Sequence, residues 1–176
     1  MNKIIIFFFC VLVFTFCTET EKPIVVVKPR VFPQYHLALD EIIRTPEGVI
    51  RGLNLNSKAD IIKKAETALP KEAGAGHLYF EYLVDSLIDY SVAYTLQKDS
   101  LEEVNVQINC KDMDVSSKIF SDLKEYYEKK LPNPTEDKGY VVYNCFEGQR
   151  KPFVISLSDN STPAKGIINL VIYKDK

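Results

Sequence analysis

Residues 88–110, IDYSVAYTLQKDSLEEVNVQINC, alternate between apolar and polar side chains on both sides of a short polar turn at 98–100. Because successive side chains of a strand point to opposite faces of a sheet, this period of two predicts two antiparallel strands that bury one face. The turn is short enough to join the strands as a hairpin. Residues 78–84 alternate in the same way and predict a third strand just before them.

Two amphipathic helices are predicted, one before and one after these strands. Residues 57–69 place apolar side chains at helical spacing, and Ser57-Lys58-Ala59-Asp60 fits a capping box. Residues 114–131 form a broader apolar stripe, which Asp114 is expected to cap. Three further strands are expected near residues 139–146, 152–158 and 166–173.

The same order of elements therefore occurs twice, in units at about residues 48–110 and 111–176. We predict an α+β domain over residues 48–176, in which two helix-plus-three-strand units form one antiparallel sheet of about six strands with two helices packed on one face. Residues 48–56 are expected to be a short strand or an extended lead-in. In element order alone, the domain resembles the tandem-repeat proteins of the β-lactamase-inhibitor-protein type and related outer-membrane assembly lipoproteins.

The segment before this domain, residues 17–47, is predicted to be a proline-containing tether. Proline fixes φ and lacks a backbone donor, so its repeated use favours extended chain over helix. Within the tether, residues 36–44 are expected to form two helical turns with Leu37, Ile42 and Ile43 facing inward. The prolines of this segment are Pro23, Pro29, Pro33 and Pro46.

The N-terminus has the three parts of a secretion signal. Lys3 gives a positive start, residues 4–16 are apolar except for Thr15, and the polar run TETEK follows at 18–22. This pattern is typical of a signal peptide, here residues 1–16. The apolar run is shorter than the roughly 20 residues that a membrane-spanning helix needs.

Residues Phe14-Thr15-Phe16-Cys17 resemble the lipobox of bacterial lipoproteins, in which a cysteine follows the apolar core. Phe14 and the β-branched Thr15 fit, whereas Phe16 stands where that family prefers a small residue. The resemblance implies that Cys17 is lipidated and becomes the first mature residue. It also implies an anchor in the outer membrane, facing the periplasm or the cell surface, because Thr18 is not the aspartate of an inner-membrane retention signal. Two alternatives stay open: conventional cleavage that gives a secreted protein, and an uncut segment that acts as a short anchor.

The charge balance restricts the possible partners of the protein. The whole chain has 22 basic and 24 acidic residues. Among charged residues, cleavage of residues 1–16 removes only Lys3. The mature chain would then have 21 basic and 24 acidic residues, a net charge of −3. This weakly acidic balance argues against a nucleic-acid partner, which would require a basic patch.

Two cysteines, Cys110 and Cys145, lie in the predicted domain. In an exported protein they form either a disulfide or two buried free thiols.

No set of residues predicts a catalytic or metal site, so we expect a non-enzymatic protein without a cofactor. Ser121 and Lys124 have the Ser-x-x-Lys spacing of penicillin-recognising enzymes, and residues 158–160 spell their Ser-Asp-Asn motif, but the Lys-Thr-Gly motif is missing. The histidines, His36 and His77, have no acidic or histidine partner at ligand spacing.

The polar face of the strands at 88–110 is the candidate partner-binding surface. It carries mainly uncharged hydrogen-bonding side chains that could contact an envelope protein or a glycan, although a merely solvated face would have the same pattern. Its members are Ser91, Thr95, Gln97, Glu103, Asn105, Gln107 and Asn109. We therefore predict a lipid-anchored binding or assembly protein of the bacterial cell envelope. The alternatives are an envelope hydrolase with an unrecognised acid pair and a passive surface structural protein.

Overall fold

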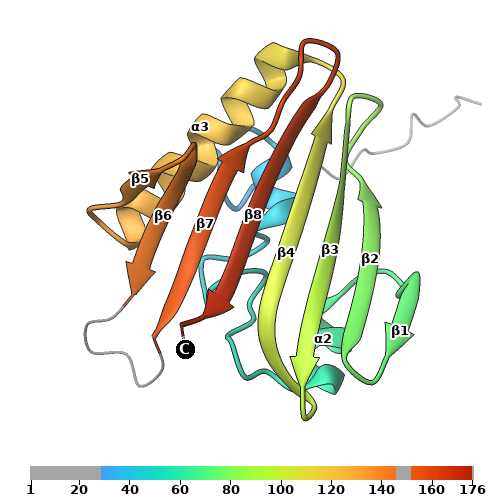
Figure 1. Cartoon of the computed structure of the whole chain (residues 1–176). Helices are drawn as coiled ribbons and strands as arrows, with labels where there is room; N and C mark the ends of the chain where they lie inside the picture. Colours follow the sequence, from blue (N-terminus) through green and yellow to red (C-terminus); the bar gives the residue numbers. More distant parts are fainter. Residues whose placement is uncertain (1–28, 146–151, 176) are drawn as a thin grey trace, which may run out of the picture.

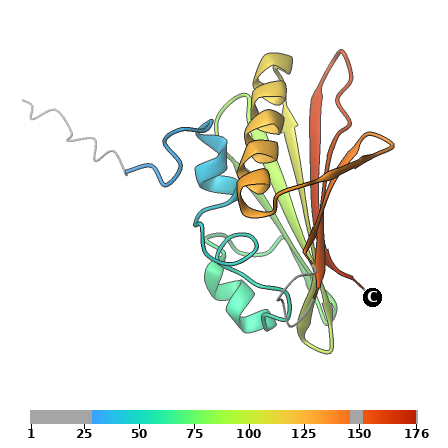
Figure 2. The same cartoon turned by 90° about the vertical axis from the view of Figure 1, so that its left-hand side faces the viewer.

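The computed structural model describes residues 29–145 and 152–175 (Figure 1). Their strands form one eight-stranded antiparallel sheet in the order β1-β2-β3-β4-β8-β7-β6-β5. The strands are β1 (Glu72–Gly74), β2 (His77–Leu83), β3 (Ile88–Gln97), β4 (Ser100–Cys110), β5 (Thr135–Asp137), β6 (Tyr140–Cys145), β7 (Phe153–Asp159) and β8 (Gly166–Lys174). The helices are α1 (Ala38–Ile42), α2 (Ala59–Ala65) and α3 (Met113–Lys130). All three lie on one face of the sheet, and no helix of the described residues covers the other face (Figure 2).

The sheet consists of two four-stranded meanders that meet in its centre. β1 to β4 follow one another along the chain, as do β5 to β8, and α3 connects the two sets. The central pair is β4 and β8, whose register runs from Glu103 opposite Tyr173 to Cys110 opposite Gly166. Within each meander, consecutive strands are neighbours because short turns can join antiparallel strands without a crossover.

The core lies between the sheet and the helices. Every second residue of β3, and of β4 from Val104 onward, is buried, as Tyr90 and Ile108 are, and their side chains point toward the helix layer. From α3, Ile119, Leu123 and Tyr127 are fully buried at a spacing of four residues, which places them on one face of the helix. The alternation of the strands and the helical period of α3 thus converge on one apolar layer.

The first turn of α3 is fixed by a cap and by a glycine. The cap is Asp112, whose Oδ1 accepts from the backbone nitrogens of Asp114 and Val115 at 2.8 and 3.1 Å, so the expectation that Asp114 caps this helix is wrong. Gly166 of β8 lets this turn approach the sheet, because a Cβ at that position would lie 2.5 Å from the Ser116 side chain.

The predicted fold class is wrong in its numbers of strands and helices. The structure has eight strands and three helices, whereas we expected about six strands and two helices in helix-plus-three-strand units. The additional strands, β1 and β5, have three exposed residues each, too few to show an alternation. They contain Glu, Gly and Asp, which have low strand propensity, and they form by pairing with β2 and β6. The six strands expected from alternation correspond to β2, β3, β4, β6, β7 and β8.

The segment before β1 also differs from the expectation. No side chain caps α2, because the Ser57 hydroxyl accepts from the backbone nitrogen of Asn54 at 3.2 Å and lies outside the helix. Residues 48–56 form a tight loop rather than a strand, and within it Ile50 and Leu53 pair as an isolated bridge.

Residues 29–47, the described part of the predicted tether, pack into the folded body. Leu39, Ile42 and Ile43 are fully buried, whereas Leu37, expected to face inward, is 46% exposed. α1 lies against α3, so this segment is part of the helix layer. The core therefore begins before residue 48. The five-residue α1 is too short to show a clear helical period, and proline content alone does not distinguish a tether from a series of tight turns.

A buried ion pair joins the loop at residue 51 to the end of α2. Arg51 Nε and Nη2 donate to the two carboxylate oxygens of Glu66 at 2.8 and 2.6 Å. Arg44 Nη1 lies 3.0 Å from the same carboxylate, which also accepts from the hydroxyls of Tyr82 and Tyr94. Burial by itself would raise the pKa of the Glu66 carboxyl, but the hydrogen bonds and charge of Arg51 outweigh it and lower the pKa below its ordinary value. The carboxylate is thus ionised; it accepts four hydrogen bonds and has the Arg44 guanidinium as a second positive neighbour.

Candidate functional site

The seven surface residues predicted from the sequence all lie on the uncovered face, in its β3–β4 half. Ser91 stands opposite Gln107 and Thr95 opposite Glu103, so the set is continuous across the two strands. Gln107 Nε2 donates to Asn109 Oδ1 at 3.2 Å, which joins two of its members. The seven residues are Ser91, Thr95, Gln97, Glu103, Asn105, Gln107 and Asn109.

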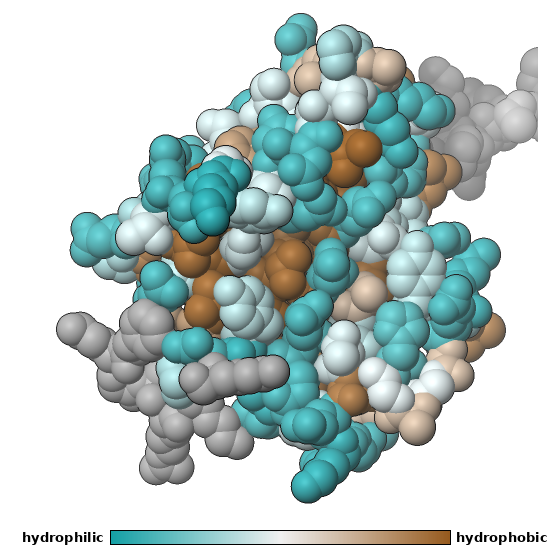
Figure 3. Space-filling view, in the orientation of Figure 1, coloured by the Kyte–Doolittle hydropathy of each residue, from teal (hydrophilic) through white to brown (hydrophobic). Residues whose placement is uncertain are grey.

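On β6, β7 and β8, this face carries no charged residue at its ten described positions, and Asp137 of β5, opposite Tyr140, places a charge at its edge. In one row Val142, Ser156 and Val171 stand side by side, and Val171 stands opposite Asn105 of the polar half. Figure 3 views this face and shows apolar atoms gathered over these strands. We call this surface the uncharged half-face. Its residues are Tyr140, Val142, Asn144, Val154, Ser156, Ser158, Ile167, Asn169, Val171 and Tyr173. Val154 and Ser158 are buried, and the other eight are partly or fully exposed.

Sequence reasoning missed the uncharged half-face because its strands are apolar on both sides. In β8 the buried residues Ile168, Leu170 and Ile172 alternate with the half-buried Ile167 and Val171. Such a pattern predicts a strand without indicating which face is uncovered. The signal that could have found this surface was the absence of Lys, Arg, Asp and Glu throughout β8 before its last residue.

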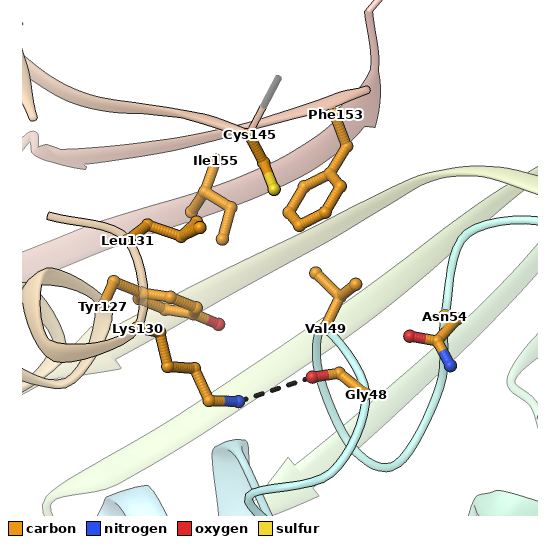
Figure 4. Close-up of a pocket in the computed structure, with 9 residues that line it drawn as sticks. All are labelled: Gly48, Val49, Asn54, Tyr127, Lys130, Leu131, Cys145, Phe153 and Ile155. Carbon is orange, nitrogen blue, oxygen red and sulfur yellow. Dashed lines mark hydrogen bonds between the residues drawn. The ribbon is translucent and has the colours of Figure 1, made fainter. Parts of the chain in front are cut away.

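A pocket of about 290 Å³ opens on the helix side of the sheet. It lies between the C-terminal end of α3, the loop at 48–54, the end of β6 and the beginning of β7 (Figure 4). Its walls are mainly apolar, so the space suits an apolar group better than water alone. The apolar side chains that line it are Val49, Leu131, Cys145, Phe153 and Ile155.

Polar atoms reach this pocket from three side chains. Tyr127 is fully buried, and its hydroxyl has no hydrogen-bond partner among the described residues. Burial raises the pKa of this hydroxyl well above its ordinary value, so it is a neutral donor. Lys130 Nζ donates to the carbonyl oxygens of Pro46 and Gly48 at 2.7 and 3.4 Å, and an ammonium group has three hydrogens to donate. Asn54 lies on the far side of the opening, as Figure 4 shows.

Cys110 and Cys145 are both buried free thiols, and they do not form a disulfide in the structure. Cys110 ends β4 and Cys145 ends β6, and β8 and β7 lie between those strands. Two strands of the sheet therefore separate the two cysteines. Burial raises the pKa of both thiols, which makes them weak nucleophiles.

The structure does not bring the remaining motif residues together. Ser121 is exposed on α3, whereas Ser158 is buried in β7, on the face of the sheet opposite the helices. The backbone nitrogen of His36 donates to Asp122 of α3, while His77 opens β2. Within residues 29–145 and 152–175, no three His, Cys, Asp or Glu side chains cluster as metal ligands would.

The predicted signal peptide and Cys17 lie outside the described residues. Within the part of the chain that the structure describes, no helix combines the length and apolar character needed to cross a membrane. Comparison with known proteins finds no matching protein family, no matching curated protein and no matching solved structure. The two resemblances drawn from the sequence therefore stay predictions.

Proposed function

We propose that this protein is an exported, lipid-anchored, non-enzymatic protein of the bacterial cell envelope that binds a protein partner through the uncharged half-face. The proposal rests on one observation, the absence of charge from ten neighbouring positions on a sheet face that no described helix covers.

Water-facing surfaces and interfaces differ in their charged residues. Lys, Glu, Asp and Arg are mostly exposed in folded proteins, so a face that meets only solvent normally carries them. In protein interfaces, charged residues are depleted from the centre and tyrosine is enriched, with a polar rim around them. The uncharged half-face contains Tyr140 and Tyr173 beside β-branched apolar residues, and the β3–β4 half supplies a polar margin. This composition favours a protein partner over solvent.

A lipid at Cys17 would keep this face near a membrane. Pro29, the first described residue, is 12 positions after Cys17, and extended chain spans at most about 3.5 Å per residue, so the connection reaches no more than roughly 40 Å. Each acyl CH₂ group contributes about 0.8 kcal/mol to membrane attachment, so several chains give a firm anchor. The partner we propose is accordingly an envelope protein within that reach.

Replacing Val171 with lysine is expected to reduce partner capture from detergent-solubilised envelopes about tenfold or more, because an unpaired charge at the centre of an interface opposes association. Val171 lies between Ser156 and Asn105 in the middle of the face. The matched control is Leu69→Lys, which adds the same charge at a residue that is 88% exposed and outside this face.

The measurement is quantitative mass spectrometry of captured proteins, made on variants whose urea unfolding curves agree. A protein lost with Val171→Lys and retained with Leu69→Lys supports the proposal. The same captured set for both variants would contradict it.

The anchor has its own test in the intact mass of the membrane-extracted protein. We expect a mature chain that begins at Cys17 and carries additional acyl mass, and we expect the Cys17→Ala variant to lose that mass and leave the membrane fraction. A wild-type chain without acyl mass would remove the lipid anchor from the proposal.

A further inference from the structure

We infer that the pocket beside α3 is a binding site for a small carboxylic acid with an apolar body. The carboxylate accepts hydrogen bonds from the Tyr127 hydroxyl and the Lys130 ammonium, and the apolar body packs against Phe153 and Ile155. This inference goes beyond the proposed function, because the pocket lies on the helix side of the sheet and the uncharged half-face lies on the opposite side.

The Tyr127 hydroxyl is the first observation that points to a ligand. A buried polar group without a partner destabilises the folded state, so such groups in folded proteins usually have a partner or a role. Tyr127 is fully buried, lines the pocket and lacks a partner among the described residues. As a protonated phenol, it can donate to an oxygen of a bound molecule.

The position of Lys130 identifies the charge of that molecule. Tyr127 and Lys130 are three residues apart on α3, so their side chains leave the same face of the helix. Both reach the pocket, and Figure 4 draws the ammonium group at its edge, on the side of the Gly48 carbonyl. Two hydrogen-bond donors, one of them a cation, suit a carboxylate, which only accepts hydrogen bonds.

The walls and the volume define the rest of the ligand. Val49, Leu131, Phe153 and Ile155 surround the space with hydrocarbon, and the Cys145 thiol adds a weakly polar sulfur. At about 290 Å³ the pocket is at the small end of the range for ligand sites, which begins near 300 Å³. A straight-chain acid of medium length fits this description, and we choose octanoate as the probe.

The experiment follows the reactivity of the two cysteines of the body in the full mature protein. Cys145 lines the pocket, whereas Cys110 is buried at the end of β4 and does not line it, so Cys110 is an internal control. Labelling by N-ethylmaleimide is measured at each site by peptide mass spectrometry, with octanoate or with 1-octanol. We expect octanoate to slow labelling of Cys145 while the rate at Cys110 is unchanged. 1-Octanol, which has the chain without the carboxylate, should protect Cys145 far less.

Two variants distinguish binding from a structural role. Tyr127→Phe and Lys130→Met should each weaken octanoate protection about tenfold or more, since hydrogen bonds to charged groups contribute about 1.5–3 kcal/mol. The control is Lys129→Met, the neighbouring lysine outside the pocket. Because the Tyr127 hydroxyl has no described partner, Tyr127→Phe should not lower the thermal midpoint. The inference is wrong if octanoate leaves the Cys145 rate unchanged, if 1-octanol protects equally well, or if neither pocket variant weakens protection.

Discussion

The Glu66→Gln variant is expected to lose about 3–5 kcal/mol of unfolding free energy, the range measured when one partner of a buried ion pair is removed. Glu66 is 7% exposed, and its carboxylate accepts hydrogen bonds from Nε and Nη2 of the Arg51 guanidinium. Glutamine keeps the shape but removes the charge, so Arg51, which is 3% exposed, is left buried without its counter-charge. Chemical unfolding in urea, monitored by circular dichroism, measures the loss.

The matched control is the exposed pair of Asp60 and Lys64, whose charged atoms lie 3.7 Å apart. Asp60→Asn should change the unfolding free energy by no more than about 0.5 kcal/mol, because exposed ion pairs contribute little. Equal effects of Glu66→Gln and Asp60→Asn on the unfolding free energy would show that the buried ion pair stabilises the fold no more than an exposed one does.

The same cluster predicts a dependence on pH. The pKa of Glu66 is lower in the folded protein than its ordinary value of 4.5, so its contribution is complete above pH 4.5 and is lost as the pH falls through the folded-state value. Between neutral pH and pH 3, the wild type should therefore lose more stability than Glu66→Gln does.

Leu39→Ala is expected to cost about 2–5 kcal/mol, the range for leucine-to-alanine changes in a packed core. Leu39 lies on α1, within the segment that the sequence predicted to be a tether, and it is fully buried. A residue in a solvated tether would contribute almost nothing, so this variant tests whether the folded body includes residues 29–47.

Leu37→Ala is the control for this prediction. Leu37 immediately precedes α1 and is 46% exposed, so its loss should cost less than about 1 kcal/mol. Urea midpoints and slopes of the two variants measure the difference. Similar midpoints for both variants would contradict the packing of α1 and would indicate that this segment is a solvated tether, as the sequence predicted.

The elements that could be predicted from the sequence are the long ones. β3 and β4 have ten and eleven residues, and α3 has eighteen, so each shows its period several times. The three residues of β1 and of β5 show no period, and these strands exist because longer neighbours offer free edges for pairing. Local pattern therefore located the longer strands, whereas tertiary contact determined the number of strands.

The candidate sites show the same division. The polar surface residues of β3 and β4 could be predicted because they alternate with buried apolar residues along two consecutive strands. The pocket combines Asn54, Tyr127 and Phe153, which are far apart in the chain, and the Arg51–Glu66 pair joins a loop to the end of a helix. Such groupings depend on how segments pack against one another, and no spacing within the sequence encodes them.

The most direct test of the central claim is photocrosslinking in living cells that make the protein, with a photoreactive amino acid placed at position 171. We expect one discrete adduct that contains peptides of a second protein, and no such adduct from position 63, which is exposed on α2. No adduct at position 171, the same adducts from both positions, or an adduct that contains a glycan and no second protein would contradict a protein-docking role for the uncharged half-face.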